Sequence, residues 1–510
     1  MLKRKQKFAG LVLGALVAWV MLQGTQVSQA KGQKPPEKEK PSKIADKLES
    51  NLALLNNQWS KLTDVMQNVY QAAFNILAPK LKGTYADLAR DAEFQKLCAA
   101  NGIVHLGGPM LGCVKPDGMR VWLRTVRPAK VEVCVTVDGA EKVFGPVEST
   151  LESDLTAIVP VTGLKPETRY SYKVRVDGKP ITIPGDAVIV TSPDDAKPGK
   201  VRIVFGADFH RWGLGNLKQA DLIVSRNPAA FLSYGDTAVE DRGNHVGYHR
   251  ADYLMRDFQL AWQRLAAAVP VYVTWDDHDY FNNDLAGIPP GYKKEDKEAV
   301  WDVWQQAWNN PSYGFGKDGK GVFLRTRVGQ CDVIMTDDRY FRTGQKGSFL
   351  GDEQMKWLET QLLDCKGPFI ILSCGTMWTD YVSDGKDSWG QWDPTGRERL
   401  FAFIEKNKIA GVLLVSGDRH GARGFRIPRP SGYEFYEFEP GSLGGRHGPP
   451  VSRKEWTTQL FGFESVYAFG EFSFDTTPSD PEVTFRLISE ESKEMYKLIL
   501  KRSQLTPKVK

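Results

Sequence analysis

The sequence predicts a mixed α/β protein in which a helical segment and a β-sandwich precede a large α/β domain. Three changes of pattern along the 510 residues lead to this expectation. Apolar residues first recur at helical spacing, then alternate with period two, and beyond residue 200 form short runs separated by helical stretches. We place the helical segment at 44–102, the β-sandwich at 103–195 and the α/β domain at 200–490. Residues 491–510 are expected to form a basic tail.

Residues 1–30 have the pattern of a secretory signal peptide. A basic start, Lys3 to Lys7, precedes the apolar stretch 8–22, and Ser28-Gln-Ala30 offers a small-x-small cleavage site. The apolar stretch is shorter than the roughly 20 residues that a membrane-spanning helix needs. We therefore expect cleavage, no transmembrane segment afterwards, and a secreted or periplasmic protein; an uncleaved anchor is the alternative. The Pro- and Lys-rich residues 31–43 predict a linker.

The net charge of +5 gives no general case for a nucleic-acid partner. Four basic residues lie within the first thirty residues, which contain no acid, so the rest of the chain is nearly neutral. Nucleic acid remains conceivable only as a substrate. The six cysteines contain no CxxC pair, so a zinc ribbon is not predicted, and their disulfide pairing stays open.

The helical segment begins with a heptad-like stripe. Apolar or small residues recur from Leu48 to Ile76 at alternating steps of four and three, and Pro79 ends the pattern. Such a stripe serves either oligomerisation through residues 44–78 or packing of the helix on its own protein. Both alternatives stay open at this point.

Residues 103–195 contain β-rich runs such as 131–137 and 170–176, separated by the turn signals Asp138-Gly139 and Asp177-Gly178. Several short strands at this spacing predict a small β-sandwich. The phrase from Gly163 to Tyr172 resembles the fibronectin type III signature, which implies a fibronectin III-like module.

Four of the predicted strands in the α/β domain end in acids or histidines. The runs 201–205, 230–234, 269–275 and 411–416 lead into four motifs: Asp208-Phe-His210, Gly235-Asp236, Asp276-Asp-His-Asp279 and Gly417-Asp-Arg-His420. Ligands bind α/β sheets at the carboxyl ends of the strands. Three acids and a histidine so close together repel one another unless a cation lies among them. The set of four motifs therefore predicts a metal site.

The order Asp-x-His, Gly-Asp, Asp-His and Gly-x-x-His resembles the calcineurin-like metallophosphoesterases, over roughly residues 105–450. The variants Trp275-Asp-Asp-His-Asp and Ser416-Gly-Asp-x-His, with the phrases 337–342 and 350–358, are similar to the alkaline phosphatase D branch. This resemblance implies a four-layer αββα catalytic domain and two metal ions. The implied metal ligands are Asp208, His210, Asp236 as the bridge, Asp277, Asp418 and His420.

The resemblance also implies roles around the metals. His278 is expected to contact the phosphate or protonate the leaving oxygen, and Arg339 to neutralise a phosphate oxygen. Two polar segments are expected at the substrate mouth: the loop with His245 and His249, and the Gly-rich loop with His447.

The chain departs from the alkaline phosphatase D pattern at the iron ligands of that branch. Asp208 and Val239 stand in place of its Cys and Tyr, and Ser373-Cys374-Gly375 follows a late strand where the superfamily has a His. The second site is then rich in carboxylates, which favours Ca, Mg or Mn, whereas a first site with two histidines suits Fe, Mn or Zn. Cys374 is expected to be a buried structural residue, with a soft metal ligand as the alternative.

These observations together predict an exported two-metal phosphoesterase that hydrolyses phosphate mono- or diesters with a metal-activated water. The rival prediction is a non-catalytic envelope binding or assembly protein that retains the fold.

Overall fold

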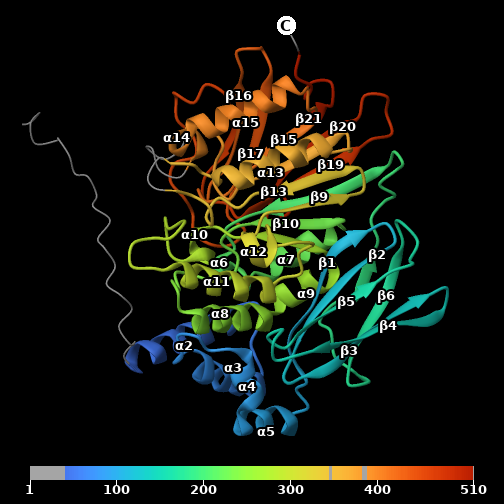
Figure 1. The fold of residues 1–510 in the computed structure, drawn as a ribbon. Helices are drawn as coiled ribbons and strands as arrows, with labels where there is room; N and C mark the ends of the chain where they lie inside the picture. Colours follow the sequence, from blue (N-terminus) through green and yellow to red (C-terminus); the bar gives the residue numbers. More distant parts are fainter. Residues whose placement is uncertain (1–40, 344–346, 382–387, 509–510) are drawn as a thin grey trace, which may run out of the picture. The chain divides into compact units, whose positions relative to one another are not determined.

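The computed structural model describes residues 41–343, 347–381 and 388–508 (Figure 1). The predicted signal peptide and most of the predicted linker lie outside these residues, and helix α2 already begins at Pro41, inside the linker prediction. Within the described ranges the chain is a mixed α/β fold with four sheets. No helix in these ranges is both long and apolar enough to span a bilayer.

The heptad-like stripe forms two helices, α2 (Pro41–Leu55) and α3 (Asp64–Leu77), where the sequence predicted one. Asn56 and Asn57 break the pattern, because their side chains accept hydrogen bonds from the backbone of Leu62 and Trp59. Thr63 then caps α3. The short helices α4 (Tyr85–Arg90) and α5 (Ala92–Ala100) follow.

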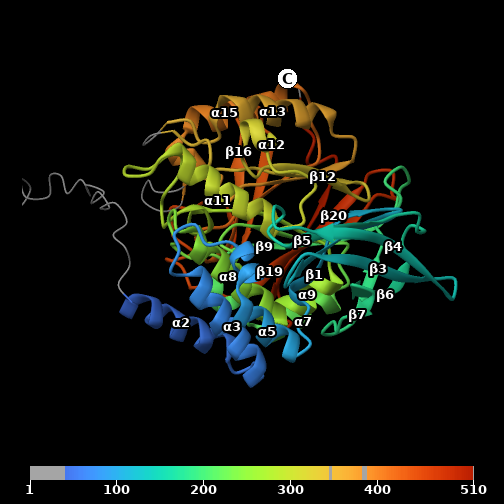
Figure 2. The same cartoon turned by 60° about the horizontal axis from the view of Figure 1, so that its bottom comes forward.

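The stripe packs on its own protein. Tyr70, Phe74 and Leu77 of α3 are fully buried in one apolar cluster with residues of α8 (Val246–Phe258), and α3 lies beside α8 in the views of Figures 1 and 2. In the structure, this stripe therefore packs against other parts of its own chain. Oligomerisation through residues 44–78 stays a prediction.

Two antiparallel sheets occupy residues 105–190. One has the order β1-β2-β5 and the other β4-β3-β6-β7, with β8 beside β6. The hairpin turn at Asp138-Gly139 has positive φ at both residues, as a two-residue type I′ turn requires. Val121 and Val159 of the first sheet share an apolar cluster with Val133 and Val174 of the second. The strands are β1 (His105–Lys115), β2 (Gly118–Thr125), β3 (Ala129–Val137), β4 (Ala140–Ser149), β5 (Thr156–Val161), β6 (Arg169–Val176), β7 (Lys179–Pro180) and β8 (Val188–Val190).

Two larger sheets form the rest of the chain, with the orders β11-β10-β9-β19-β20-β21 and β12-β13-β14-β15-β17-β16-β18. The runs 201–205, 230–234, 269–275 and 411–416, predicted as strands, are confirmed as β9, β10, β11 and β15. The sheets pack on one another, since the rings of Phe438 and Phe485, one from each sheet, have centroids 4.3 Å apart. The strands of the first sheet are β9 (Lys200–Gly206), β10 (Ala230–Tyr234), β11 (Val271–Thr274), β19 (Ala468–Asp475), β20 (Glu482–Ser489) and β21 (Glu494–Lys501). Those of the second are β12 (Leu324–Val328), β13 (Cys331–Met335), β14 (Phe369–Ser373), β15 (Val412–Val415), β16 (Ala422–Pro428), β17 (Glu434–Pro440) and β18 (Gln459–Phe463).

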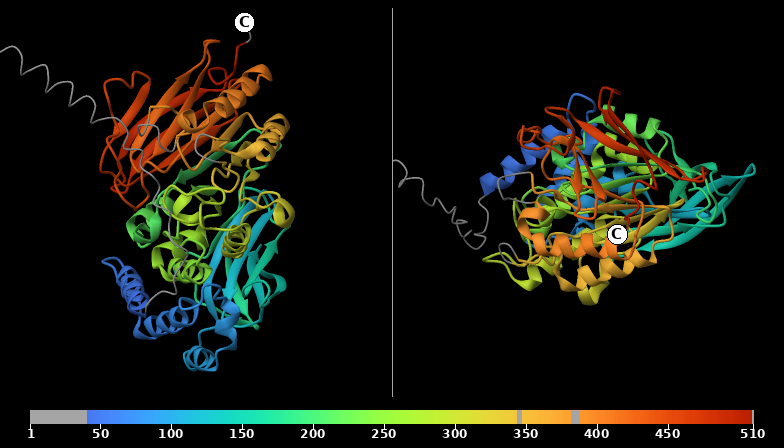
Figure 3. Two further views of the ribbon diagram at one scale, coloured as in Figure 1. Left: turned by 60° about the vertical axis from the view of Figure 1, so that its left-hand side comes forward. Right: turned by 90° about the horizontal axis from the view of Figure 1, so that it is seen from above.

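Helices cover the outer faces of both sheets. The first sheet packs on α7 (Leu217–Ser225), α9 (Leu260–Ala268) and α11 (Lys294–Ala307). The second packs on α13 (Gly351–Asp364) and α15 (Pro394–Lys406), which Figure 3 shows from the side and from above. The short helices α6 (His210–Gly213), α10 (Asp277–Tyr280), α12 (Gly316–Gly319) and α14 (Trp389–Trp392) lie in loops.

The predicted basic tail, 491–510, is wrong for most of its length. Residues Glu494–Lys501 are strand β21, which pairs antiparallel with β20. Lys497 is exposed, whereas Leu500 and Leu505 are buried in the main core. Alternation along a strand places basic side chains outside and apolar ones inside, and the basic residues alone suggested a tail.

Candidate metal centre

The predicted ligands lie at strand ends that the fold brings together. Asp208 follows β9, Asp236 follows β10, and Asp277 begins α10 just after β11; these three strands are parallel neighbours in one sheet. Asp418 and His420 follow β15 of the facing sheet. The backbone is strained here, because Asp208, Asp236 and Asp418 have φ values of 60°, 50° and 71°. Such conformations cost roughly 1–3 kcal/mol each and concentrate at functional sites.

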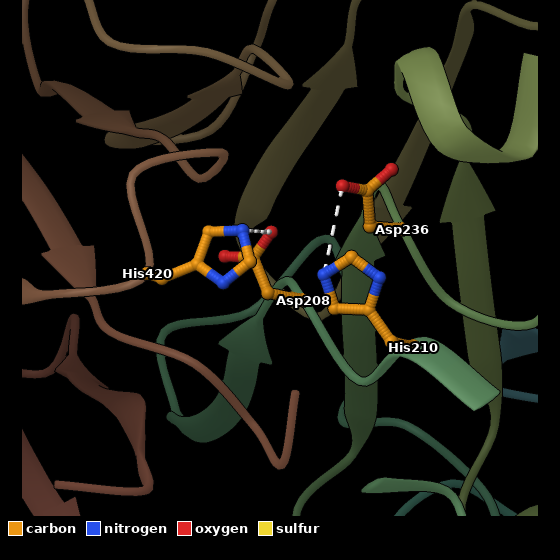
Figure 4. Close-up of side chains that lie close together, drawn as sticks. All are labelled: Asp208, His210, Asp236 and His420. Atoms are coloured by element: carbon orange, nitrogen blue, oxygen red, sulfur yellow. Dashed lines mark ion pairs between the residues drawn. The ribbon is translucent and has the colours of Figure 1, made fainter. Parts of the chain in front are cut away.

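The first group of converging side chains consists of Asp208, His210, Asp236 and His420 (Figure 4). One potential ligand atom from each lies within 4.8 Å of the others. His210 Nε2 is 3.9 Å from Asp236 Oδ2, and His420 Nε2 is 3.9 Å from Asp208 Oδ1. Two imidazoles and two carboxylates around one point form a ligand set typical of Fe, Mn or Zn.

The second group is richer in carboxylates. Asp236 also converges with Asp277 and His278, and Asp277 converges with Asp276 and Asp418, each within the same 4.8 Å limit. Asp236 thus belongs to both groups, at the position expected of a carboxylate that bridges two ions. Asp276 is not one of the ligands that the resemblance implies, although it stands in the Trp-Asp-Asp-His-Asp phrase.

The buried polar atoms of the first group fit a cation. Asp208 and Asp236 are almost fully buried, and none of their carboxylate oxygens has a hydrogen-bond partner among the described residues. Burial, together with neighbouring carboxylates, raises the pKa of both groups well above the usual value. Burial also lowers the pKa of His210 and His420 to about 3, so both rings are neutral and able to coordinate. A buried cluster of this kind is stable when a metal supplies the missing positive charge.

His278 lies beside the two groups of potential metal ligands. Two acids outside the predicted site, Asp241 and Glu240, lie against its ring. Its Nδ1 is 2.8 Å from Asp241 Oδ1 and 3.6 Å from Glu240 Oε1. Burial lowers the pKa of His278, but the hydrogen bond with Asp241 and the charges of Asp277 and Glu240 raise it overall to about 10. Glu240 Oε2 also lies 2.8 Å from His210 Nδ1, which leaves Nε2 of that ring for a metal. The only sequence signal for these acids was the charged run Glu240-Asp-Arg242 after Gly235-Asp236.

Arg339 occupies a different place from the one predicted. Its side chain is fully buried, its Nε donates to Asp276 Oδ1, and its Nη2 is 3.9 Å from Asp418 Oδ1. It lies among the acids of the second group and is not one of the residues that line the cavity over them. The expected contact between Arg339 and a phosphate oxygen stays a prediction.

His245 and His249 are not among the residues that line the cavity over the ligands, and their expected substrate role stays a prediction. His249 is buried and its Nε2 is 2.9 Å from the Gly243 carbonyl oxygen. His245 caps helix α8 by accepting a hydrogen bond from the Tyr248 backbone. Cys374 is buried in the apolar cluster beneath helices α13 and α15, in agreement with its expected structural role.

A cavity of about 240 Å³ opens over the metal groups. Residues of both groups line it, with His278 and the predicted His447. The remaining lining residues are Glu240, Asn283, Asp284, Arg419, Arg446, Gly448 and Pro449. The cavity gives a small anionic substrate access to the ligands and to His278.

Two family models match parts of this chain, and solved structures are similar to it in fold. The PhoD-like phosphatase family matches residues 232–483, and a domain of unknown function (DUF7800) matches residues 104–193. A solved structure of PhoD is 18% identical and has a TM-score of 0.64, covering 79% of this chain and 91% of that one. The purple acid phosphatase PPD1 of yellow lupin (Lupinus luteus) seeds is 15% identical with a TM-score of 0.57, covering 77% of this chain and 74% of its own. No curated protein sequence matches the chain.

Proposed function

We propose that this chain is an exported, metal-dependent phosphatase that hydrolyses phosphate mono- or diesters with two metal ions. The match of residues 232–483 to the PhoD-like phosphatase family supports this proposal. The observation that carries the two-ion proposal is the shared carboxylate Asp236, which converges with both groups of ligands. The signal-like residues 1–30 support export.

The same proposal extends to the ligands and the domains. Asp208, His210 and His420 would hold a first ion of Fe, Mn or Zn, and Asp277 and Asp418 a second ion of Ca, Mg or Mn, with Asp236 between them. The paired sheets and their outer helices would correspond to a four-layer αββα catalytic domain, and residues 103–195 to a fibronectin III-like module.

The proposed reaction needs the two ions, a water molecule and a proton donor. Bound ions would neutralise phosphate oxygens and make a water acidic enough to attack phosphorus. The oxygen of water forms the new P–O bond, the bond to the alcohol breaks, and the alcohol oxygen takes a proton. His278 is the proposed proton donor, because Asp241 engages its Nδ1 and leaves Nε2 as the nitrogen that can serve the cavity. Glu240 holds His210 in the tautomer that coordinates through Nε2.

The purified full chain tests this proposal through its metal content and its turnover of 4-nitrophenyl and bis(4-nitrophenyl) phosphate. Asp236→Asn should lose bound metal and activity together. His278→Ala should keep its metal and lose about 10²–10⁴-fold in kcat. Asp138→Asn, in an exposed hairpin turn, is the control and should match the wild type. Metal binding without any turnover would instead favour a binding protein that retains the fold, and turnover in the Asp236→Asn variant would contradict the site.

A further inference from the structure

Basic side chains gather on one side of the cavity, outside the metal ligands. Arg419 lies between the ligands Asp418 and His420, after β15. Arg446 and His447 come from the loop between β17 and β18, and all three line the cavity. Besides the proposed ligand Asp418, the acids that line the cavity are Glu240 and Asp284.

The loop that carries Arg446 and His447 is packed tightly against the site by two glycines. A Cβ at Gly445 would lie 2.2 Å from His210 Cδ2, and one at Gly448 would lie 2.0 Å from the Arg419 carbonyl oxygen. Neither distance is compatible with a side chain, so these positions need glycine for the loop to approach this closely. The basic groups are therefore held at the rim by contacts with the site itself.

Arg446 has a defined position within this loop. Its guanidinium lies over the ring of Trp212, 5.0 Å from the ring centroid, and its carbonyl oxygen is 3.0 Å from His420 Nδ1. The ring of His447 packs edge-on against Tyr467, with the ring centroids 4.7 Å apart. A cation–π contact of this kind lowers the entropic cost of presenting the guanidinium to an anion.

Arg419 lies beside the proposed ligand Asp418. Its Nη1 is 3.6 Å from Asp418 Oδ2, and its side chain is 19% exposed. Its Nε is buried and has no hydrogen-bond partner among the described residues. A buried N–H without a hydrogen-bond partner is unfavourable, and an anion bound beside it would accept that hydrogen bond.

We propose that Arg419, Arg446 and His447 form a second anion subsite, which selects phosphate monoesters whose leaving group carries another phosphate. This inference rests on the proposed function, in which the metal groups bind the phosphate that is cleaved. That phosphate lies over the ligands, so the rim faces the alcohol part of the ester. Guanidinium groups suit a phosphate there because they donate two parallel hydrogen bonds.

A matched pair of substrates tests the subsite: adenosine 5′-phosphate and adenosine 3′,5′-bisphosphate, assayed by phosphate release from the full-length enzyme with its metals. The wild type should prefer the bisphosphate by at least tenfold in kcat/KM. Arg446→Ala should lower kcat/KM for the bisphosphate about 10–100-fold and that for the monophosphate less than threefold. Arg446→Lys should restore part of the preference, and added salt should weaken it in the wild type.

Lys454→Ala removes an exposed positive charge in the same loop that does not line the cavity, and it should leave both rates unchanged. Equal losses on both substrates in Arg446→Ala would overturn the inference, since they would assign the residue to the cleaved phosphate or to the fold. An absent preference in a wild type that cleaves the monophosphate would also overturn it and leave the proposed function intact. Failure of the wild type to cleave either ester would contradict the proposed function itself.

Discussion

Replacing Asp241 by asparagine removes the charge that holds His278 and preserves the size of the side chain. Asp241 Oδ1 is 2.8 Å from His278 Nδ1 and also accepts the backbone N–H of Asn283 at 2.7 Å. The second contact needs only an oxygen, which asparagine retains. The substitution therefore isolates the ion pair with His278 and leaves the loop in place.

The size of the expected fall in kcat follows from the loss of the charged contact between Asp241 and His278. A hydrogen bond between charged groups contributes about 1.5–3 kcal/mol, and each 1.36 kcal/mol in the barrier is tenfold in rate. We expect kcat of Asp241→Asn to fall about 10–150-fold. The sign of the pH effect is also determined: the hydrogen bond with Asp241 raises the pKa of His278 against the lowering effect of burial. Loss of the negative charge of Asp241 lowers the pKa of His278, so the alkaline limb of the rate profile should move to lower pH.

Steady-state kinetics between pH 6 and 10 measure both effects, with metal content determined on the same samples. Asp138→Asn removes one charge from an exposed turn and should keep the wild-type profile. A variant Asp241→Asn that retains its metal and turns over within twofold of the wild type, with an unmoved alkaline limb, would refute the assignment of His278 as proton donor.

Three further outcomes follow from the structure. Asp154 forms buried ion pairs with Arg124 and Arg250, at distances of 3.2 and 2.8 Å. Asp154→Ala should therefore lower the free energy of unfolding, measured by urea titration, by about 3–5 kcal/mol. Burial raises the pKa of Asp154, but the two arginines bring it below the usual 3.8; their stabilisation is present above pH 4 and is lost as pH falls through the folded-state pKa. Asn51→Leu breaks the hydrogen bond to Arg211, the neighbour of His210, and equilibrium dialysis should show weaker metal binding than in Asn101→Leu. Removal of metal by chelation should lower the melting temperature, since metal at 100 times its Kd stabilises the folded state by about 2.7 kcal/mol.

The ligand positions could be predicted from the sequence because they depend on local features. Asp208, Asp236 and Asp277 each follow a short apolar strand, and the carboxyl ends of these parallel strands meet at one edge. Asp418 follows β15 of the facing sheet. The strand runs themselves are recognisable from their composition. These two properties place Asp208, Asp236 and Asp277 near one another without any knowledge of the loops, whereas Asp418 and His420 reach them through the packing of the two sheets.

The roles that depend on loop packing could not be predicted in the same way. Arg339 and His249 stand in polar phrases, yet both are buried by tertiary contacts that lie far away in sequence. Glu240 and Asp241 were overlooked for the converse reason: their importance arises only because the loop after Asp236 returns to His210 and His278. The hydrophobic periodicity and the composition of a sequence carry no information about contacts between residues that are far apart along the chain.

The break between α2 and α3 has a local cause that periodicity conceals. Apolar spacing continues across residues 56–63, but Asn56 and Asn57 offer side-chain oxygens to the backbone and compete with the helix. A pair of adjacent asparagines inside a heptad-like pattern is therefore a reason to divide a predicted helix.

The most direct test of the account is the metal content of the purified wild type, measured by inductively coupled plasma mass spectrometry beside its phosphate-ester turnover. The shared position of Asp236 predicts two ions per chain in the active enzyme, and loss of both turnover and bound metal in Asp236→Asn. Full turnover with a single ion per chain, or with none, would contradict the two-metal centre.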